Sequence, residues 1–177
     1  RATWERGWSF IKRAGSVILA ATVVLWFLQG FGFEDGVFGM VEDQDNSILA
    51  AVASAIAWIF APLGFGSWQA VASSLSGFVA KEGIVSTMGV LANMAEATET
   101  DAALWQYVMT DFFHGSALAG FTFLTFNLLD SPCLAAISTM AKEMGNKGWT
   151  AFAVIFQNVF AYAVCLMIYQ LGSFAMG

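Results

Sequence analysis

The hydrophobic positions of this chain form five long apolar segments, and shorter stretches between them carry most of the charged residues. The segments cover residues 14–33, 48–66, 68–91, 112–129 and 149–174. Each is about as long as an α-helix must be to cross a hydrocarbon core about 30 Å thick. Helices are expected because an open strand would leave backbone groups unpaired in lipid. The pattern predicts an all-α, polytopic transmembrane bundle with about five spans.

Composition supports the same class. Hydrophobic residues make up 58% of the chain and charged residues 11%, whereas soluble domains carry about 25% charged residues. The formal net charge of −6 argues against nucleic acid as a partner. The chain starts at Arg1 without an initiator Met, so we expect it to be a piece of a longer polypeptide.

Basic residues are few enough for their placement to predict the topology. Of the seven Lys and Arg residues, four lie within residues 1–13 and two within 142–148. Basic segments tend to stay on the cytoplasmic side, so we expect the N-terminus and the 142–148 loop to be cytoplasmic. The acidic loops, 34–47 and 92–111, are then expected outside the membrane, and five crossings place the C-terminus outside as well.

The N-terminal stretch has an amphipathic pattern. Trp4, Trp8 and Ile11 fall on one helical face, with charged residues largely elsewhere. This pattern is typical of a helix lying in the membrane interface. The chain is therefore divided into a cytoplasmic interfacial helix, residues 1–13, and a transmembrane helical domain, residues 14–177.

The most unusual polar positions are Lys81 and Glu82, in the middle of the third apolar segment. Ionisable groups at that depth are costly unless they face protein or water, and they favour a functional hypothesis. The two side chains diverge by about 100° around a helix, so at least one is expected to face an interior surface. Glu82 shares its stripe with Ser86.

Two features predict how the second and third segments are built. Gly77 and Gly83 bracket the charged pair, which permits a broken or re-entrant helix at 68–91. Pro62 and Gly64 end the second segment just before Trp68 opens the third, so the two helices are expected to form a tight hairpin.

A second candidate site follows the fourth segment. In the sequence 130–133, Asp130 or Ser131 is expected to cap a helix whose first position is Pro132. Cys133 then falls in the first turn, and Met140 lies on the same face seven residues later. Sulfur ligands suit a soft or borderline metal, although a Cys and a Met on an apolar helix also serve as packing residues.

Asp111 and His114 lie three residues apart at the expected outer end of the fourth segment. A carboxylate and an imidazole suit a divalent metal, but two groups do not complete a site. A helix-capping Asp and an interfacial His are the competing interpretation. Cys165, in the last segment, is predicted to be a packing residue.

Several motifs resemble, in order and spacing, the C-terminal membrane portion of the FeoB family of bacterial ferrous iron transporters. They are FIKRAG at 10–15, APLGFG at 61–66 followed by WQA at 68–70, GFVAKE at 77–82, PCLAA at 132–136 and YQLG at 169–172. Two positions depart from the family pattern: Ser131 stands where Val or Thr is usual, and His114-Gly115 where Thr-Pro is usual.

The resemblance implies a Gate-type membrane domain that follows a cytoplasmic GTPase domain in a multi-pass protein of the bacterial inner membrane. It implies Fe²⁺ as the transported substrate, with Cys133 as the main candidate ligand and Glu82 and Lys81 in the other matched motif; Met140, Ser131 and Ser86 complete the candidate pathway. GTP and Mg²⁺ would act only through the other domain, because no Gly-rich phosphate loop is present here. The implied partners are the lipid bilayer, the rest of the same transporter and further copies of it.

Other functions remain open at this stage. Related Gate domains occur in nucleoside transporters, so a carrier for a nucleoside-like organic solute is the main alternative. An intramembrane enzyme using Glu82 or His114 as acid or base lacks a recognisable nucleophile and oxyanion group, and we therefore expect no enzymatic activity. A purely structural subunit would tolerate replacement of Cys133 and Glu82.

Overall fold

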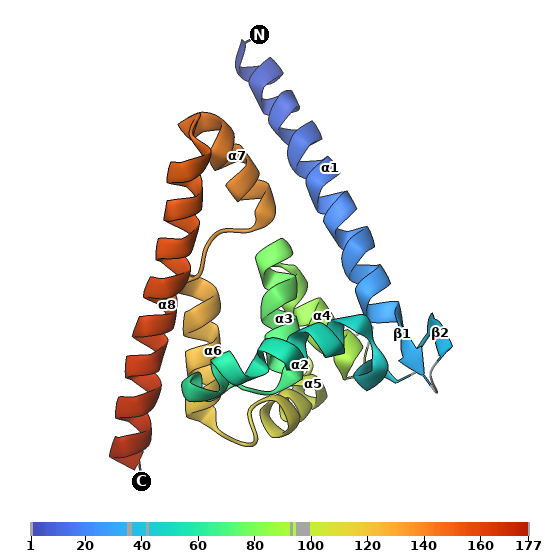
Figure 1. Cartoon of the computed structure of the whole chain (residues 1–177), viewed down its shortest axis with the longest axis vertical. Helices are drawn as coiled ribbons and strands as arrows, with labels where there is room; N and C mark the ends of the chain where they lie inside the picture. Colours follow the sequence, from blue (N-terminus) through green and yellow to red (C-terminus); the bar gives the residue numbers. More distant parts are fainter. Residues whose placement is uncertain (1, 35–36, 42, 93, 95–99, 177) are drawn as a thin grey trace.

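The computed structural model describes residues 2–34, 37–41, 43–92, 94 and 100–176 (Figure 1). Its helices are α1 (Ala2–Gly30), α2 (Ile48–Phe60), α3 (Trp68–Val79), α4 (Gly83–Leu91), α5 (Ala102–Tyr107), α6 (Ala117–Leu129), α7 (Leu134–Met144) and α8 (Lys147–Met176). Shorter elements are the strands β1 (Phe31–Glu34) and β2 (Val37–Met40), the 3-10 turns η1 (Gln44–Asn46) and η2 (Ala61–Leu63), and the π-helical turn η3 (Val108–Phe112). The predominance of helix confirms the predicted class.

One β-hairpin departs from the all-α prediction. α1 ends at Gly30, and the last residues of the first apolar segment continue as β1, paired antiparallel with β2. The ring of Phe31 stacks on that of Phe27, with centroids 4.7 Å apart, and lies 6.0 Å from that of Phe38. Aromatic residues favour strands through such contacts, so the hairpin covers the end of α1.

Helix α1 runs without a break through the boundary predicted between residues 13 and 14. The N-terminal stretch is therefore helical as expected, but it is not a separate element. Trp4 and Trp8 are both exposed. The position of this N-terminal stretch in a membrane interface stays a prediction.

The second and third apolar segments do not form the predicted tight hairpin. They meet at an angle of 100°, because the chain turns through η2 and through Gly64, whose φ is 90°. Ser67 then caps α3 by accepting a hydrogen bond from the Ala70 backbone N–H. α2 has 13 residues and is about 20 Å long, too short to cross a bilayer alone.

The helix break predicted at 68–91 is confirmed. α3 ends at Val79, Ala80 is extended with φ −150° and ψ 110°, and α4 begins at Gly83. α4 then packs along α3: a Cβ placed on Gly77 would lie 2.6 Å from the Ile84 side chain. The two half-helices form a hairpin whose tip carries the charged pair (Figure 1).

The fourth segment begins later than predicted. The chain passes through His114 and Gly115, both with positive φ, and α6 starts at Ala117 after the N-cap Ser116. Residues 130–133 interrupt the helix again before α7.

The count of about five spans is not confirmed. In the described part of the chain, two stretches are long and apolar enough to cross a bilayer, Ala117–Met144 and Lys147–Ala175. A third requires counting Ile48–Leu63 and Trp68–Val79 as one span across their bend. The apolar part of α1, Gly15–Gly30, is shorter. Apolar length alone does not distinguish a spanning helix from one packed inside the protein.

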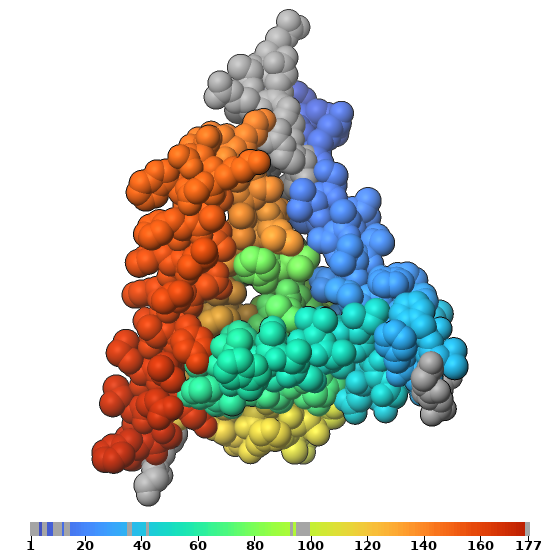
Figure 2. All heavy atoms as spheres, viewed as in Figure 1, coloured from blue at the N-terminus to red at the C-terminus, as the bar shows by residue number. Residues whose placement is uncertain are grey.

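The elements are arranged between two ends. The start of α1 and the turn between α7 and α8 lie at one end, and α5 and the C-terminus lie toward the other (Figure 1). α1 and α8 flank the molecule, with α3 and α7 between them and α2 crossing the front (Figure 2). The helix breaks after α3 and after α6 both lie at mid-height.

Candidate functional site

The two helix breaks are joined by an ion pair. Lys81 lies in the turn between α3 and α4, and its Nζ is 2.5 Å from Oδ1 of Asp130, the residue that follows α6. The same ammonium donates a hydrogen bond to the backbone carbonyl of Asn127, at 2.7 Å. Because each break frees the chain from helical geometry, residues from two separate helices meet around one cation.

Burial explains why these charges occur together. The Asp130 side chain is 4% exposed and that of Lys81 is 35% exposed. An unpaired carboxylate at such a position would be costly, whereas a paired and hydrogen-bonded one is tolerated. The prediction that at least one charge of the pair at 81–82 faces the interior is therefore confirmed by Lys81. Glu82 is exposed.

Asn127 extends this site toward α3. Its Nδ2 donates hydrogen bonds to the Ser74 hydroxyl at 3.2 Å and to the Phe123 carbonyl at 2.8 Å. Its Oδ1 is buried and has no hydrogen-bond partner among the described residues. A Cβ at Gly77 would lie 3.5 Å from this oxygen. A buried amide oxygen without a donor is an available ligand or acceptor.

The 130–133 segment differs in detail from the predicted cap. The N-cap of α7 is Cys133, without a side-chain hydrogen bond, and not Asp130 or Ser131. Asp130 is diverted to Lys81, and the buried Ser131 hydroxyl accepts a hydrogen bond from Nδ2 of Asn158 in α8, at 2.9 Å. The side chains of Asp130 and Ser131, which local sequence preferences assign to helix capping, therefore bind residues distant in sequence.

The other predicted ligands do not assemble into a preformed metal site. No group of three or more His, Cys, Asp or Glu side chains able to hold a metal occurs in the part of the chain that the structure describes. Cys133 and Met140 are both partly buried on α7, whereas Glu82 and Ser86 are exposed on α4.

Asp111 and His114 belong to the connection between α5 and α6, at the end of the molecule away from the ion pair (Figure 1). Both are exposed. The cap of α6 is Ser116, so the interpretation of Asp111 as a cap for this helix is wrong. The structure does not bring these two residues to the central site.

Asn127 and Asn158 are not among the residues predicted from the sequence, and Asp130 is predicted only as a cap. The signal available was that each Asn is an amide within an apolar segment, where unsatisfied polar groups are costly. Their partners, Ser74, Lys81 and Ser131, are far away in sequence.

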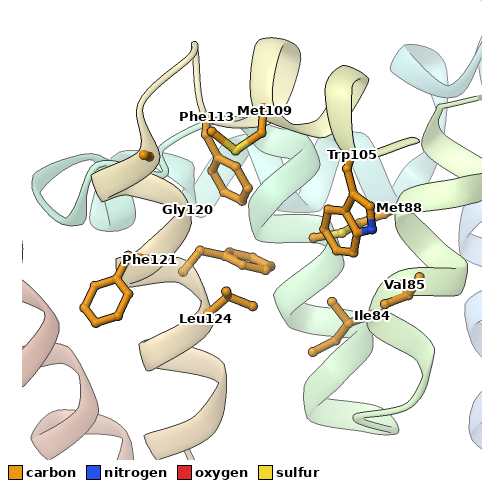
Figure 3. A pocket seen from close by; sticks show the side chains of 11 residues that line it. Ile84, Val85, Met88, Trp105, Met109, Phe113, Gly120, Phe121 and Leu124 are labelled. Carbon is orange, nitrogen blue, oxygen red and sulfur yellow. The ribbon is translucent and has the colours of Figure 1, made fainter. Parts of the chain in front are cut away.

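A separate pocket lies between α4, α5 and α6, with a volume of about 330 Å³ (Figure 3). Its lining is apolar apart from the indole nitrogen of Trp105. The lining residues are Ile84, Val85, Met88, Trp105, Met109, Phe113, Ala117, Gly120, Phe121, Phe123 and Leu124. None of the ion-pair residues takes part, so the pocket and the polar site are distinct.

The two cysteines differ in accessibility, which predicts a labelling result. Cys133 is partly exposed, whereas Cys165 is fully buried and its Sγ lies 3.6 Å from the Thr122 carbonyl. N-ethylmaleimide is expected to modify the folded protein once, at Cys133, because thiol reactivity requires access. Mass spectrometry checks this: unfolding should expose the second thiol, Cys133→Ala should remain unmodified when folded, and two adducts on the folded protein would contradict the structure.

Comparisons with known proteins relate the chain to one family. The family described as "Gate: Nucleoside recognition" matches residues 11–147. The chain is 35% identical over 172 residues to "Fe(2+) transporter FeoB" of Staphylococcus aureus (strain MSSA476), covering 97% of this chain and 24% of that protein. It is 28% identical over 175 residues to the protein of the same name from Methanocaldococcus jannaschii, covering 97% of this chain and 25% of that protein.

A third relative, "Fe(2+) transporter FeoB" of Salmonella typhi, is 27% identical over 219 residues, covering 98% of this chain and 28% of that protein. No solved structure matches. The chain spans about a quarter of the length of the curated relatives it matches.

Proposed function

From the fact that this chain belongs to the Gate family, we propose that it forms a membrane part of a ferrous iron transporter. The observation that carries this proposal is the similarity to Fe(2+) transporters along 97% of the chain, in a bacterium and in an archaeon. The structure adds two broken helices that meet at mid-height (Figure 1). Transporters build ion sites from such discontinuous helices, because the freed backbone and side chains can coordinate an ion.

The proposed pathway passes the break before α7. There the Cys133 thiolate replaces part of the water shell of Fe²⁺, and Met140 and Glu82 act as weaker ligands along the route. One thiolate with weaker ligands suits conduction, because a conducted ion must be released as readily as it is bound. Ser131, Ser86, Asp111 and His114 are further candidates for residues along the pathway.

We propose a topology with three crossings: α1, the α6–α7 pair and α8. In this topology α2 lies across the molecule and the α3–α4 hairpin re-enters, so the second and third predicted segments do not cross. Because removing two crossings leaves the following segments on the same sides, the predicted orientation of the last two segments is unchanged. The basic N-terminus and the 142–148 loop lie at the same end (Figure 1), which supports a cytoplasmic position for both.

The remaining proposals concern the whole protein. The chain works in the bacterial inner membrane with residues 1–13 at its cytoplasmic interface, joined to the rest of the transporter. A GTPase domain in that remainder, using GTP and Mg²⁺, regulates access to the pathway, and the transporter assembles from several copies. The chain itself carries no catalytic reaction.

A nucleoside-like solute is not favoured as the substrate. Recognition of a nucleoside requires several placed hydrogen-bonding groups. The pocket of about 330 Å³ is lined by apolar side chains apart from Trp105, and the relatives reported above are named as Fe(2+) transporters.

Uptake of radiolabelled Fe²⁺, kept reduced, tests the proposal in cells that lack other iron importers and express the full-length polypeptide carrying this chain. Cys133→Ala is expected to lower uptake by about ten-fold or more, because even the loss of a group that hydrogen-bonds to a metal ligand typically costs about 10–100-fold. Cys165→Ala is the matched control, because that thiol is fully buried, and its uptake should stay within about two-fold of the unaltered protein.

Two results would count against this account. Uptake that is unchanged in Cys133→Ala at equal membrane levels would remove this thiol from the mechanism. Absence of Fe²⁺ uptake by the unaltered protein would overturn the proposed function itself.

A further inference from the structure

We propose that Asp130 and Asn127 form an oxygen-ligand site for the transported divalent cation, and that the Lys81 ammonium occupies this site until the cation displaces it. This inference rests on the proposed function and deepens it. It assigns an ion-binding role to Asn127, which no sequence motif indicates, and to Asp130, which the sequence indicates only as a helix cap.

The polar site at the two helix breaks already holds a cation, the Lys81 ammonium. The Lys81 ammonium lies 2.5 Å from the Asp130 carboxylate and 2.7 Å from the backbone carbonyl oxygen of Asn127. A carboxylate and a main-chain carbonyl are typical oxygen ligands of divalent metal ions. The geometry that binds an ammonium here is therefore close to one that binds a metal.

The Asn127 side chain has a buried oxygen without a hydrogen-bond partner among the described residues. Asn127 is 7% exposed, and its Oδ1 has no hydrogen-bond donor among the described residues. An unsatisfied buried acceptor costs free energy, and a cation would remove that cost. Asn127 and Asp130 are three positions apart at the end of α6, so both can face a common ion.

The position of Lys81 allows its ammonium to leave the site. Lys81 is 35% exposed and lies at the tip of the α3–α4 hairpin, so its long side chain can move away from Asp130 without unfolding a helix. An ammonium and a divalent cation cannot occupy the same few ångströms, because their repulsion is strong in a partly buried site. Lys81 therefore acts as a tethered competitor: it compensates the Asp130 charge when the ion is absent and weakens ion binding enough to permit release.

Cys133 lies three residues after Asp130, at the end of the same break, where it is the N-cap of α7. The proposed oxygen site and the proposed thiolate site are thus successive positions along the same connection between α6 and α7. An incoming ion would exchange water first for oxygen ligands and then for sulfur, or in the reverse order.

Titration with Co²⁺ tests this proposal, using the purified full-length polypeptide in lipid nanodiscs under anaerobic conditions. Calorimetry measures affinity, and absorption distinguishes thiolate from oxygen ligation. Asp130→Asn is expected to weaken Co²⁺ binding by about ten-fold, because it removes the ligand charge but keeps an acceptor for Lys81. Lys81→Met is expected to tighten binding by about ten-fold, because the competitor is absent.

The double variant Lys81→Met with Asp130→Asn separates this role from a structural one. The gain from Lys81→Met should disappear once the carboxylate is absent. Asp45→Asn is the matched control, since Asp45 is an exposed carboxylate in η1, and it should bind Co²⁺ as the unaltered protein does. Cys133→Ala should abolish the thiolate absorption while the Asp130-dependent affinity remains.

Each outcome decides the proposal. Unchanged affinity in Asp130→Asn would overturn the oxygen site, even with Fe²⁺ uptake intact and the proposed function standing. Weaker binding in a folded Lys81→Met protein would overturn the competitor role. If Lys81→Met does not fold, Asp130→Asn still decides whether the site exists. If the unaltered protein shows neither Co²⁺ binding nor Fe²⁺ uptake, the proposed function is overturned as well.

Discussion

Replacing Gly64 with alanine is expected to lower the free energy of unfolding by about 4 kcal/mol, because backbone strain and a steric clash add at this position. Gly64 has φ 90°, where a side chain is strained. A Cβ there would also lie 2.1 Å from the Tyr169 ring of α8. Reversible unfolding in mixed micelles, followed by circular dichroism, measures the effect.

Two other glycines provide controls for the strain alone. Gly115 and Gly145 also have positive φ, but a Cβ at either would meet nothing within 4 Å. Their alanine variants should each cost about 1 kcal/mol. Combining Gly64→Ala with Tyr169→Ala should recover part of the loss. Equal effects at all three glycines would contradict the close packing of Gly64 on Tyr169.

The Gly64 turn matters because it positions the α3–α4 hairpin. The hydroxyl of Thr122 in α6 donates to the Leu63 carbonyl at 2.8 Å, and Nε2 of Gln170 in α8 donates to the Pro62 carbonyl at 3.3 Å. The turn is thus attached to both long helical stretches. A shift here would displace Lys81 from Asp130, so Gly64→Ala is also expected to reduce transport.

Lys81→Met is expected to destabilise the ion-free protein by about 3 kcal/mol. The substitution leaves the Asp130 carboxylate, 4% exposed, without its counter-charge. Breaking one partner of a buried pair typically costs about 3–5 kcal/mol, and the partial exposure of Lys81 places the effect at the lower end. The same unfolding assay, performed with a chelator present, measures it.

A double-mutant cycle assigns this loss to the pair. Asp130→Asn in the Lys81→Met background removes the uncompensated charge, so the double variant should be more stable than Lys81→Met alone. Lys142→Met is the control at an exposed position of α7, where about 0.5 kcal/mol or less is expected. Additive effects of the two substitutions would show that the residues do not interact.

The sequence allowed the broken helix to be predicted but not its direction. Two charges between Gly77 and Gly83 make a continuous lipid-facing helix unfavourable, and the break is present at 80–82. Whether the chain then continues or returns depends on which surface covers α4. Packing of Ile84 against Gly77 favours the return, and that contact follows only from the three-dimensional arrangement.

The same distinction applies to Asp130. Locally, an acidic residue before Ser-Pro-Cys is a good helix cap, and the sequence favours that role. In the folded chain the carboxylate binds Lys81, 49 positions away, because pairing a buried charge outweighs one capping hydrogen bond. The N-cap position passes to Cys133.

From the sequence alone, the helical membrane class, the family resemblance and the candidate residues Cys133 and Lys81 could be established, because they depend on composition, apolar length and short motifs. The tertiary structure decided the 100° turn at Gly64, the return of α4 along α3 and the Lys81–Asp130 pair. These features depend on contacts between residues far apart in the chain, whose free energies of packing and charge pairing exceed the local preferences that a sequence pattern reports.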